Sequence, residues 1–85
     1  MFNLFANTNK KGVEQMNIEV RYKIKLIRLK KGITLRELER ISGVSRSEIS
    51  AIERNKIDAK LTTLLMIALS LKVNITDLFD IVVCK

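Results

Sequence analysis

The 85-residue chain carries sixteen Lys and Arg against nine Asp and Glu, a formal net charge of +7, and 47% of it is hydrophobic. This length allows one domain, and the apolar content is sufficient for a compact core. With no histidine and one cysteine, the chain lacks the ligands of a usual zinc site and any Ser-His or Cys-His nucleophile pair. We therefore expect neither an enzyme nor a metal or cofactor, and no feature indicates a small-molecule ligand.

The positive charge is concentrated in the middle of the chain. Residues 21–60 hold twelve Lys and Arg against five Asp and Glu, whereas the flanking segments each hold two basic and two acidic residues. A localised basic segment is typical of nucleic-acid binders, although a merely solvated basic surface would look the same. The longest apolar run, LLMIALSL, is far shorter than the roughly 20 residues of a membrane span, and no signal-peptide pattern opens the chain. We expect a cytoplasmic protein that does not enter a membrane.

The first residues show no sustained periodicity, so residues 1–16 are expected to form a flexible tail. Within it, three apolar side chains form a candidate hook onto a partner or onto the domain: Phe2, Leu4 and Phe5. The domain is expected over residues 17–80, followed by a short extension over residues 81–85.

The first helix is predicted from an apolar rhythm near the start of this domain. Val20, Ile24 and Ile27 follow the i, i+4, i+7 spacing of one helix face. Gly32 is suited to the left-handed position that ends a helix. The first helix is therefore expected to run from about Val20 to the residue before Gly32.

Two helix-start signals follow within 15 residues. Thr34 precedes Glu37 by three positions, and Ser45 precedes Glu48 by three positions, so both pairs match the capping-box pattern. Gly43 lies between the two helices that these signals open. The spacing predicts a tight helix-turn-helix.

The remaining elements are also predicted to be helical. The segment LTTLLMIALSLK is apolar nearly all round, which predicts a helix buried on several sides. Asn74 and Asp77 form a cap for a last short helix, ITDLFD. No alternating apolar and polar stretch is long enough to predict a strand, although IVV near the end has some β character. The fold class is therefore expected to be all-α, with five short helices.

Three consecutive segments of the sequence resemble the phage-repressor/Cro-like, or XRE-type, helix-turn-helix family. They are IRLKKGITLREL, SGVSRSEISAIERNK and LTTLLMIALSLKVNITDLF, in family order and spacing, within about Ile18 to Phe79. The resemblance implies a compact lambda-repressor-like domain in which helices 2 and 3 form the helix-turn-helix. It also implies a transcriptional regulator, expected to be a repressor, that binds double-stranded DNA sequence-specifically. The protein would be encoded by a bacterium, phage or mobile element.

The family resemblance assigns roles to individual residues. The helix that follows Ser45 would enter the major groove N-terminus first. The base-reading positions would be Arg46, Ser47 and Ser50, and Arg46 is suited to guanine. The phosphate-contacting positions would be Thr34, Arg36, Ser45, Arg54, Asn55 and Lys56. Glu48 would either face the DNA or serve the helix cap.

The family resemblance also implies a structural ion pair between Arg28 and Glu53, the alternative being two unpaired surface charges. The chain departs from the family pattern at two positions of the second helix. Leu35 replaces a glutamine that touches phosphate, and Glu39 occupies a position that is usually small. We expect either a small tilt of the second helix or an outward turn of Glu39 toward Arg36 or Arg40.

The family resemblance implies a homodimer on a pseudo-palindromic operator. Apolar residues near the end of the chain form a candidate dimer surface: Met66, Leu69, Phe79, Ile81, Val82 and Val83. Alternatively, the N-terminal tail folds over the same residues. The competing class is an antitoxin or adaptor that binds mainly another protein. A membrane-surface role and RNA binding are weaker readings, because the first helix needs its apolar face for the core and the chain has no aromatic platform.

Overall fold

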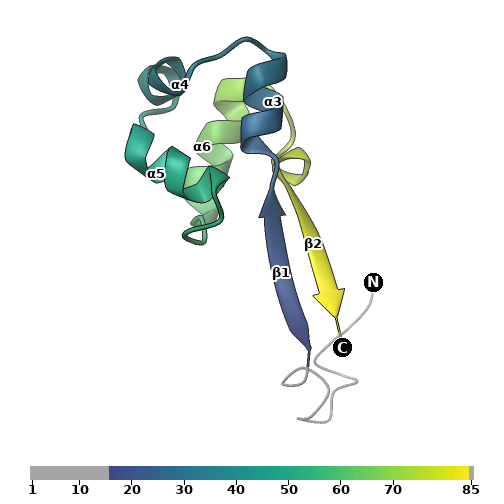
Figure 1. Cartoon of the computed structure of the whole chain (residues 1–85). Coiled ribbons are helices and arrows are strands. Elements are labelled where there is room, and N and C mark those ends of the chain that lie inside the picture. Colours follow the sequence, from purple (N-terminus) through teal and green to yellow (C-terminus); the bar gives the residue numbers. More distant parts are fainter. Residues whose placement is uncertain (1–15, 85) are drawn as a thin grey trace.

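The computed structural model describes residues 16–84, which form a helical body and a two-stranded ribbon that extends from it (Figure 1). In chain order the elements are β1 (Asn17–Tyr22), α3 (Ile24–Lys30), α4 (Leu35–Ser42), α5 (Arg46–Glu53), α6 (Leu61–Leu71), the 3-10 helix η1 (Ile75–Leu78) and β2 (Phe79–Cys84). The tail residues Phe2, Leu4 and Phe5 lie outside the described residues.

The core lies where the helices meet around α6. The fully buried large side chains come from every helix of the body: Ile24, Leu38, Ile49, Ile52, Ile67, Leu71 and Leu78. Helix α6 packs against both α4 and η1 and buries Leu64, Ile67 and Leu71. The prediction of a helix buried on several sides is only partly right, because another side of α6 leaves Met66 and Leu69 exposed.

The expectation of an all-α fold with five helices is wrong at both ends of the domain. Residues 17–22 form β1 in place of the start of a first helix, and α3 begins only at Ile24. The expected fifth helix is the 3-10 helix η1, and the chain becomes extended from Phe79 onward. The fold is mostly helical, with four α-helices and a two-stranded sheet within residues 16–84.

The two strands pair antiparallel and join the two ends of the domain. The register runs from Asn17 opposite Cys84 to Tyr22 opposite Phe79. Strand β2 therefore crosses the junction between residues 80 and 81, where we expected the domain to pass into an extension. This pairing connects residues that are far apart in the sequence, so no local pattern specifies it.

Tyr22 anchors the ribbon to the helical body. Its ring packs against the core, and its hydroxyl oxygen accepts a hydrogen bond from the Ala59 N–H at 3.0 Å. The Lys23 N–H donates to the Leu78 carbonyl at 2.7 Å. The inner end of the ribbon is thus fixed by both packing and hydrogen bonds.

Replacing Tyr22 with Phe tests this anchor. Tyr22→Phe keeps the ring but leaves the half-buried Ala59 N–H without its acceptor, so we expect a loss of about 1 kcal/mol in the free energy of unfolding. Urea denaturation followed by circular dichroism measures this loss. An unchanged unfolding midpoint would show that the hydroxyl does not anchor the ribbon.

Candidate nucleic-acid interface

Helices α4 and α5 form the predicted helix-turn-helix, and the caps that delimit them are in place. Thr34 Oγ1 accepts a hydrogen bond from the Glu37 N–H at 3.1 Å, and Ser45 Oγ accepts one from the Glu48 N–H at 3.2 Å. Gly43 ends α4 with φ of 81°, in the left-handed region that a side chain disfavours. The caps predicted at Thr34 and Ser45 are therefore confirmed.

Helix α5 separates its core residues from the base-reading candidates. Ile49 and Ile52 are fully buried, whereas Arg46 and Ser47 are exposed and Ser50 is half-buried. These three candidates therefore lie at the N-terminal end and along the outer side of α5. A helix of this kind can present its first turn to a groove while its opposite side holds it to the domain.

Glu39 binds Arg46 across the turn between the two helices. Its Oε2 accepts a hydrogen bond from the Arg46 N–H at 3.0 Å, and its Oε1 lies 3.1 Å from Arg46 Nε. The expectation that Glu39 turns toward Arg36 or Arg40 is wrong, because the first turn of α5 offers both an unpaired N–H and a guanidinium. The acidic residue at a usually small position was the signal for this contact.

Glu48 has its carboxylate on the side of α6. Its Oε2 accepts a hydrogen bond from Thr63 Oγ1 at 3.4 Å, and the side chain is half-buried. Its backbone N–H is the group that Ser45 caps. Glu48 thus links α5 to α6 in this structure, a contact that sequence reasoning missed.

The phosphate-contacting candidates lie at the start, at the turn and after the end of the helix-turn-helix. All six are exposed: Thr34, Arg36, Ser45, Arg54, Asn55 and Lys56. Asn55 has φ of 57°, and the Lys56 N–H donates to the Ala51 carbonyl at 2.8 Å. Among residues 16–84, the ion pairs do not involve Arg36, Arg54 or Lys56, so these cations remain available to anions.

Arg28 and Glu53 form a bidentate ion pair inside the domain. Arg28 Nε donates to Glu53 Oε2 at 2.9 Å and Nη2 donates to Oε1 at 3.2 Å, with side chains 7% and 4% exposed. Arg28 Nη1 also donates to the Ile33 carbonyl at 3.0 Å. One guanidinium therefore connects α3, the loop before α4 and the last turn of α5.

The residues of the candidate dimer surface lie on two elements. Met66 and Leu69 are exposed on α6, and Leu69 is 77% exposed. The other four lie in β2, where Phe79 and Val82 are half-buried and Ile81 and Val83 are exposed. Because alternate strand residues point to opposite faces, Val82 faces away from Ile81 and Val83.

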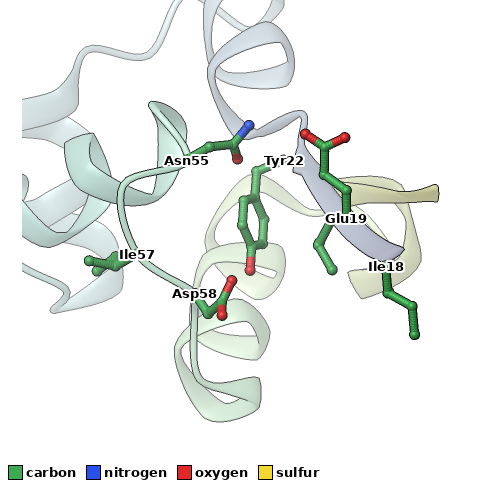
Figure 2. Close-up of a pocket in the computed structure, with 7 residues that line it drawn as sticks. Ile18, Glu19, Tyr22, Asn55, Ile57 and Asp58 are labelled. Atoms are coloured by element: carbon green, nitrogen blue, oxygen red, sulfur yellow. The ribbon is translucent and has the colours of Figure 1, made fainter. Parts of the chain in front are cut away.

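A hollow of about 200 Å³ lies between β1 and the loop after α5. Figure 2 shows Tyr22 between the strand and the loop that carries Asn55, Ile57 and Asp58.

Within the described part of the chain, no group of three or more His, Cys, Asp or Glu side chains could hold a metal ion. No helix within residues 16–84 is long and apolar enough to cross a membrane.

Breaking the Arg28–Glu53 pair should destabilise the domain. Glu53→Ala leaves a buried guanidinium without its counter-charge, so we expect the free energy of unfolding to fall by about 3–5 kcal/mol. The matched control is Glu37→Ala, whose exposed carboxylate lies 3.9 Å from Arg40 and should change stability by less than about 0.5 kcal/mol. Equal effects of the two substitutions in urea denaturation would contradict the assignment.

Comparisons with known structures give the same fold. The restriction-modification controller protein C.AhdI from Aeromonas hydrophila matches with a TM-score of 0.63 and 25% identity over 65% of this chain and 83% of that one. The N-terminal DNA binding domain of SinR from Bacillus subtilis matches with a TM-score of 0.61 and 34% identity over 64% and 80% of the two chains. The clp gene regulator ClgR from Corynebacterium glutamicum matches with a TM-score of 0.60 and 31% identity over 64% and 70%.

The sequence matches the helix-turn-helix family model HTH_3 over residues 24–78, well over half of the chain. No curated protein matches the sequence significantly. The family match begins with α3 and ends with η1, so it covers the whole helical body and leaves out the two strands. The family consists of DNA-binding regulators and not of enzymes. The chain therefore belongs to the XRE-type helix-turn-helix family of DNA-binding transcriptional regulators.

Proposed function

We propose that this chain is a sequence-specific transcriptional repressor that inserts α5 into the major groove of double-stranded DNA. The observation that carries the proposal is the arrangement at the start of α5, where an exposed arginine is oriented by a carboxylate of the preceding helix. Within residues 16–84, exposed cations without an ion-pair partner lie on α4, at Arg36, and after α5, at Arg54 and Lys56. This arrangement offers one group for base recognition and several for the phosphate backbone.

Arg46 is the principal base-reading residue in this proposal. Its contact with Glu39 uses Nε, which leaves the two terminal nitrogens of the guanidinium for the O6 and N7 of guanine. Ser47 and Ser50 add hydroxyls that bond to several base edges. Specificity should therefore be strongest at the base pair that Arg46 contacts.

The phosphate contacts fix the orientation of α5 on the duplex. Arg36 replaces the phosphate contact that Leu35 cannot make, and Thr34 and Ser45 place helix N-termini toward the backbone. After α5, Arg54, Asn55 and Lys56 would hold the opposite strand. Each cation that neutralises a phosphate contributes to affinity in a salt-dependent and sequence-independent way.

The regulator acts in the cytoplasm, in this proposal, as a homodimer on a pseudo-palindromic operator. It would block transcription by occupying a promoter, including that of its own gene. Two sets of apolar residues are candidates for the dimer contact: Met66 and Leu69 on α6, and Phe79, Ile81, Val82 and Val83 in β2. The three similar structures are described as a controller protein, a DNA-binding domain and a gene regulator, which supports this class of function.

A second candidate function is that of an antitoxin or adaptor that binds mainly another protein. The apolar side chains that the described part of the chain leaves exposed favour it, among them Leu69 on α6 and Ile81 in β2. Recovery of a stable second polypeptide with the protein from its native host would favour this function over autonomous repression.

Binding to DNA from upstream of the protein's own gene tests the proposal. Fluorescence anisotropy compares this DNA with a scrambled duplex, and we expect a preference for the upstream DNA that persists as salt is raised. Arg46→Ala should reduce that preference by about 1–3 kcal/mol. Arg46→Lys keeps the charge but not the planar fork, so it should also lose preference while retaining the salt dependence of the wild type.

Equal and salt-sensitive binding of the wild type to both duplexes would contradict sequence-specific recognition of this DNA. Lys56→Gln serves as the control for a phosphate contact. It should weaken binding to both duplexes equally and reduce the slope of log affinity against log salt by about 0.9.

Glu39→Gln tests whether Glu39 positions Arg46. The amide oxygen can still accept from the Arg46 N–H, but the ionic contact with Nε is lost. We expect the preference for the upstream DNA to fall by about 1 kcal/mol, while affinity for scrambled DNA rises because a negative charge near phosphate is removed. Glu37→Gln, on the same helix, removes a charge that does not contact Arg46. If both variants alter the preference equally, Glu39 does not position Arg46.

A further inference from the structure

The ribbon formed by β1 and β2 has one fully apolar face. Opposite residues of an antiparallel pair point to the same side of the sheet, and alternate residues share a face. The register therefore places six apolar residues on one side, here called the apolar ribbon face: Ile18, Val20, Tyr22, Phe79, Ile81 and Val83. The other side carries Asn17, Glu19, Arg21, Asp80, Val82 and Cys84.

Only the inner end of the apolar ribbon face is covered. Tyr22 and Phe79 pack against the core, whereas Ile18, Ile81 and Val83 are 55%, 60% and 51% exposed. Figure 1 shows the ribbon reaching outward from the helical body, and Ile18 meets the loop after α5 only across a hollow. An isolated two-stranded ribbon is marginally stable in water, and a sheet normally buries its apolar face.

The hollow beside β1 extends this uncovered surface toward the helical body. The strand lines it with Ile18, Glu19, Val20 and Tyr22, and the loop opposite lines it with Asn55, Ile57 and Asp58 (Figure 2). Ile57 is itself exposed. The uncovered apolar strip therefore borders a recess whose lining is part polar and part apolar.

The charge distribution indicates which partner this surface suits. The positive excess of the chain lies in residues 21–60, whereas the charges on the other side of the ribbon are paired. Glu19 lies 3.1 Å from Arg21, and Asp80 lies 3.3 Å from Lys23. The ribbon is thus one of two parts of a strongly cationic molecule where two copies meet with little repulsion, the other being α6, which carries no charged residue. Of the two, only the ribbon is a two-stranded sheet that needs a cover for its apolar face. An anionic surface such as DNA or a lipid headgroup layer would gain nothing from the uncharged apolar ribbon face.

We propose that the apolar ribbon face binds the same face of a second copy, so that two ribbons pack face to face about a twofold axis. This proposal names the contact of the dimer in the proposed function and rests on that function for its role at an operator. The identical face of a second copy matches it in length and apolar character, and sheets pack in this way at a separation of about 10 Å. The contact uses Ile81 and Val83, but neither Val82 nor the α6 residues Met66 and Leu69.

The size of the face sets the expected strength of the dimer. A strand of six residues extends about 20 Å, so two such ribbons bury less than the roughly 1,600 Å² of a standard stable interface. The free protein should therefore dimerise weakly. Two adjacent half-sites on one duplex raise the effective concentration of one copy for the other and stabilise the same contact.

Sedimentation velocity of the full chain over a concentration series tests the proposal. The test variant is Ile81→Thr/Val83→Thr, since threonine keeps the β-branched shape but places hydroxyls in the interface. We expect it to weaken self-association about tenfold or more. The matched control is Val82→Thr, the same kind of change on the other side of the same strand, and it should leave self-association unchanged. Circular dichroism verifies that both variants retain the fold.

Three results would overturn the proposal. The first is a wild type that stays monomeric at the highest concentration, which would indicate that another segment, such as residues 1–15, or another protein covers the face. The second is an equal effect of the test variant and Val82→Thr. The third is dissociation by Leu69→Gln and not by the ribbon variant, which would place the contact on α6.

A separate DNA measurement distinguishes failure of the dimer from failure of the proposed function. On a duplex with one half-site, the ribbon variant should bind as well as the wild type. On a duplex with two half-sites, it should lose the added affinity of the second copy. If neither protein prefers operator DNA while the wild type still self-associates through the ribbon, the proposed function fails and the dimer contact stands.

Discussion

The arrangement of the helices depends on the contacts of the buried Arg28 guanidinium. It bonds with both oxygens of Glu53 and with the carbonyl of Ile33, so one side chain holds α3, the chain entering α4 and the end of α5. Removing two charges from water is costly, and the pair is better understood as fixing orientation than as adding net stability. A fixed α5 is what a recognition helix requires, because a tilt of the helix would move its first turn away from a base edge.

The start and the end of α5 are likewise defined by a few residues. At its start, Ser45 and Glu39 use the unpaired N–H groups of the first turn, and Glu39 also directs the guanidinium of Arg46. At its end, the left-handed conformation of Asn55 turns the chain so that exposed cations follow the helix. Exposed cations therefore lie at both ends of α5, Arg46 at its start and Arg54 and Lys56 after it, while the proposed dimer contact uses the apolar ribbon face.

The sequence specified the helix-turn-helix well, because caps and turns are local features. Thr34 and Ser45 cap helix starts and Gly43 ends a helix, each through contacts with residues a few positions away. Such contacts can be predicted from the residue types and their spacing. The ribbon was missed for the opposite reason. Val20 and Ile24 imitate a helical spacing, and the alternation of Ile18, Val20 and Tyr22 becomes informative only once the distant partner strand is known. The contact of Glu39 with Arg46 likewise depends on the angle between two helices, which residue spacing does not give.

The most direct test of α5 as the recognition helix is an amide chemical-shift titration of the labelled protein with duplex DNA. If α5 reads the DNA, the largest changes should fall on the first turn of α5 and on residues 54–56, with smaller changes at the start of α4. The core of α6 should remain unperturbed, and a duplex with one half-site should leave the ribbon unperturbed as well. Changes concentrated on the ribbon or on α6, with α5 silent, would contradict α5 as the DNA-reading element.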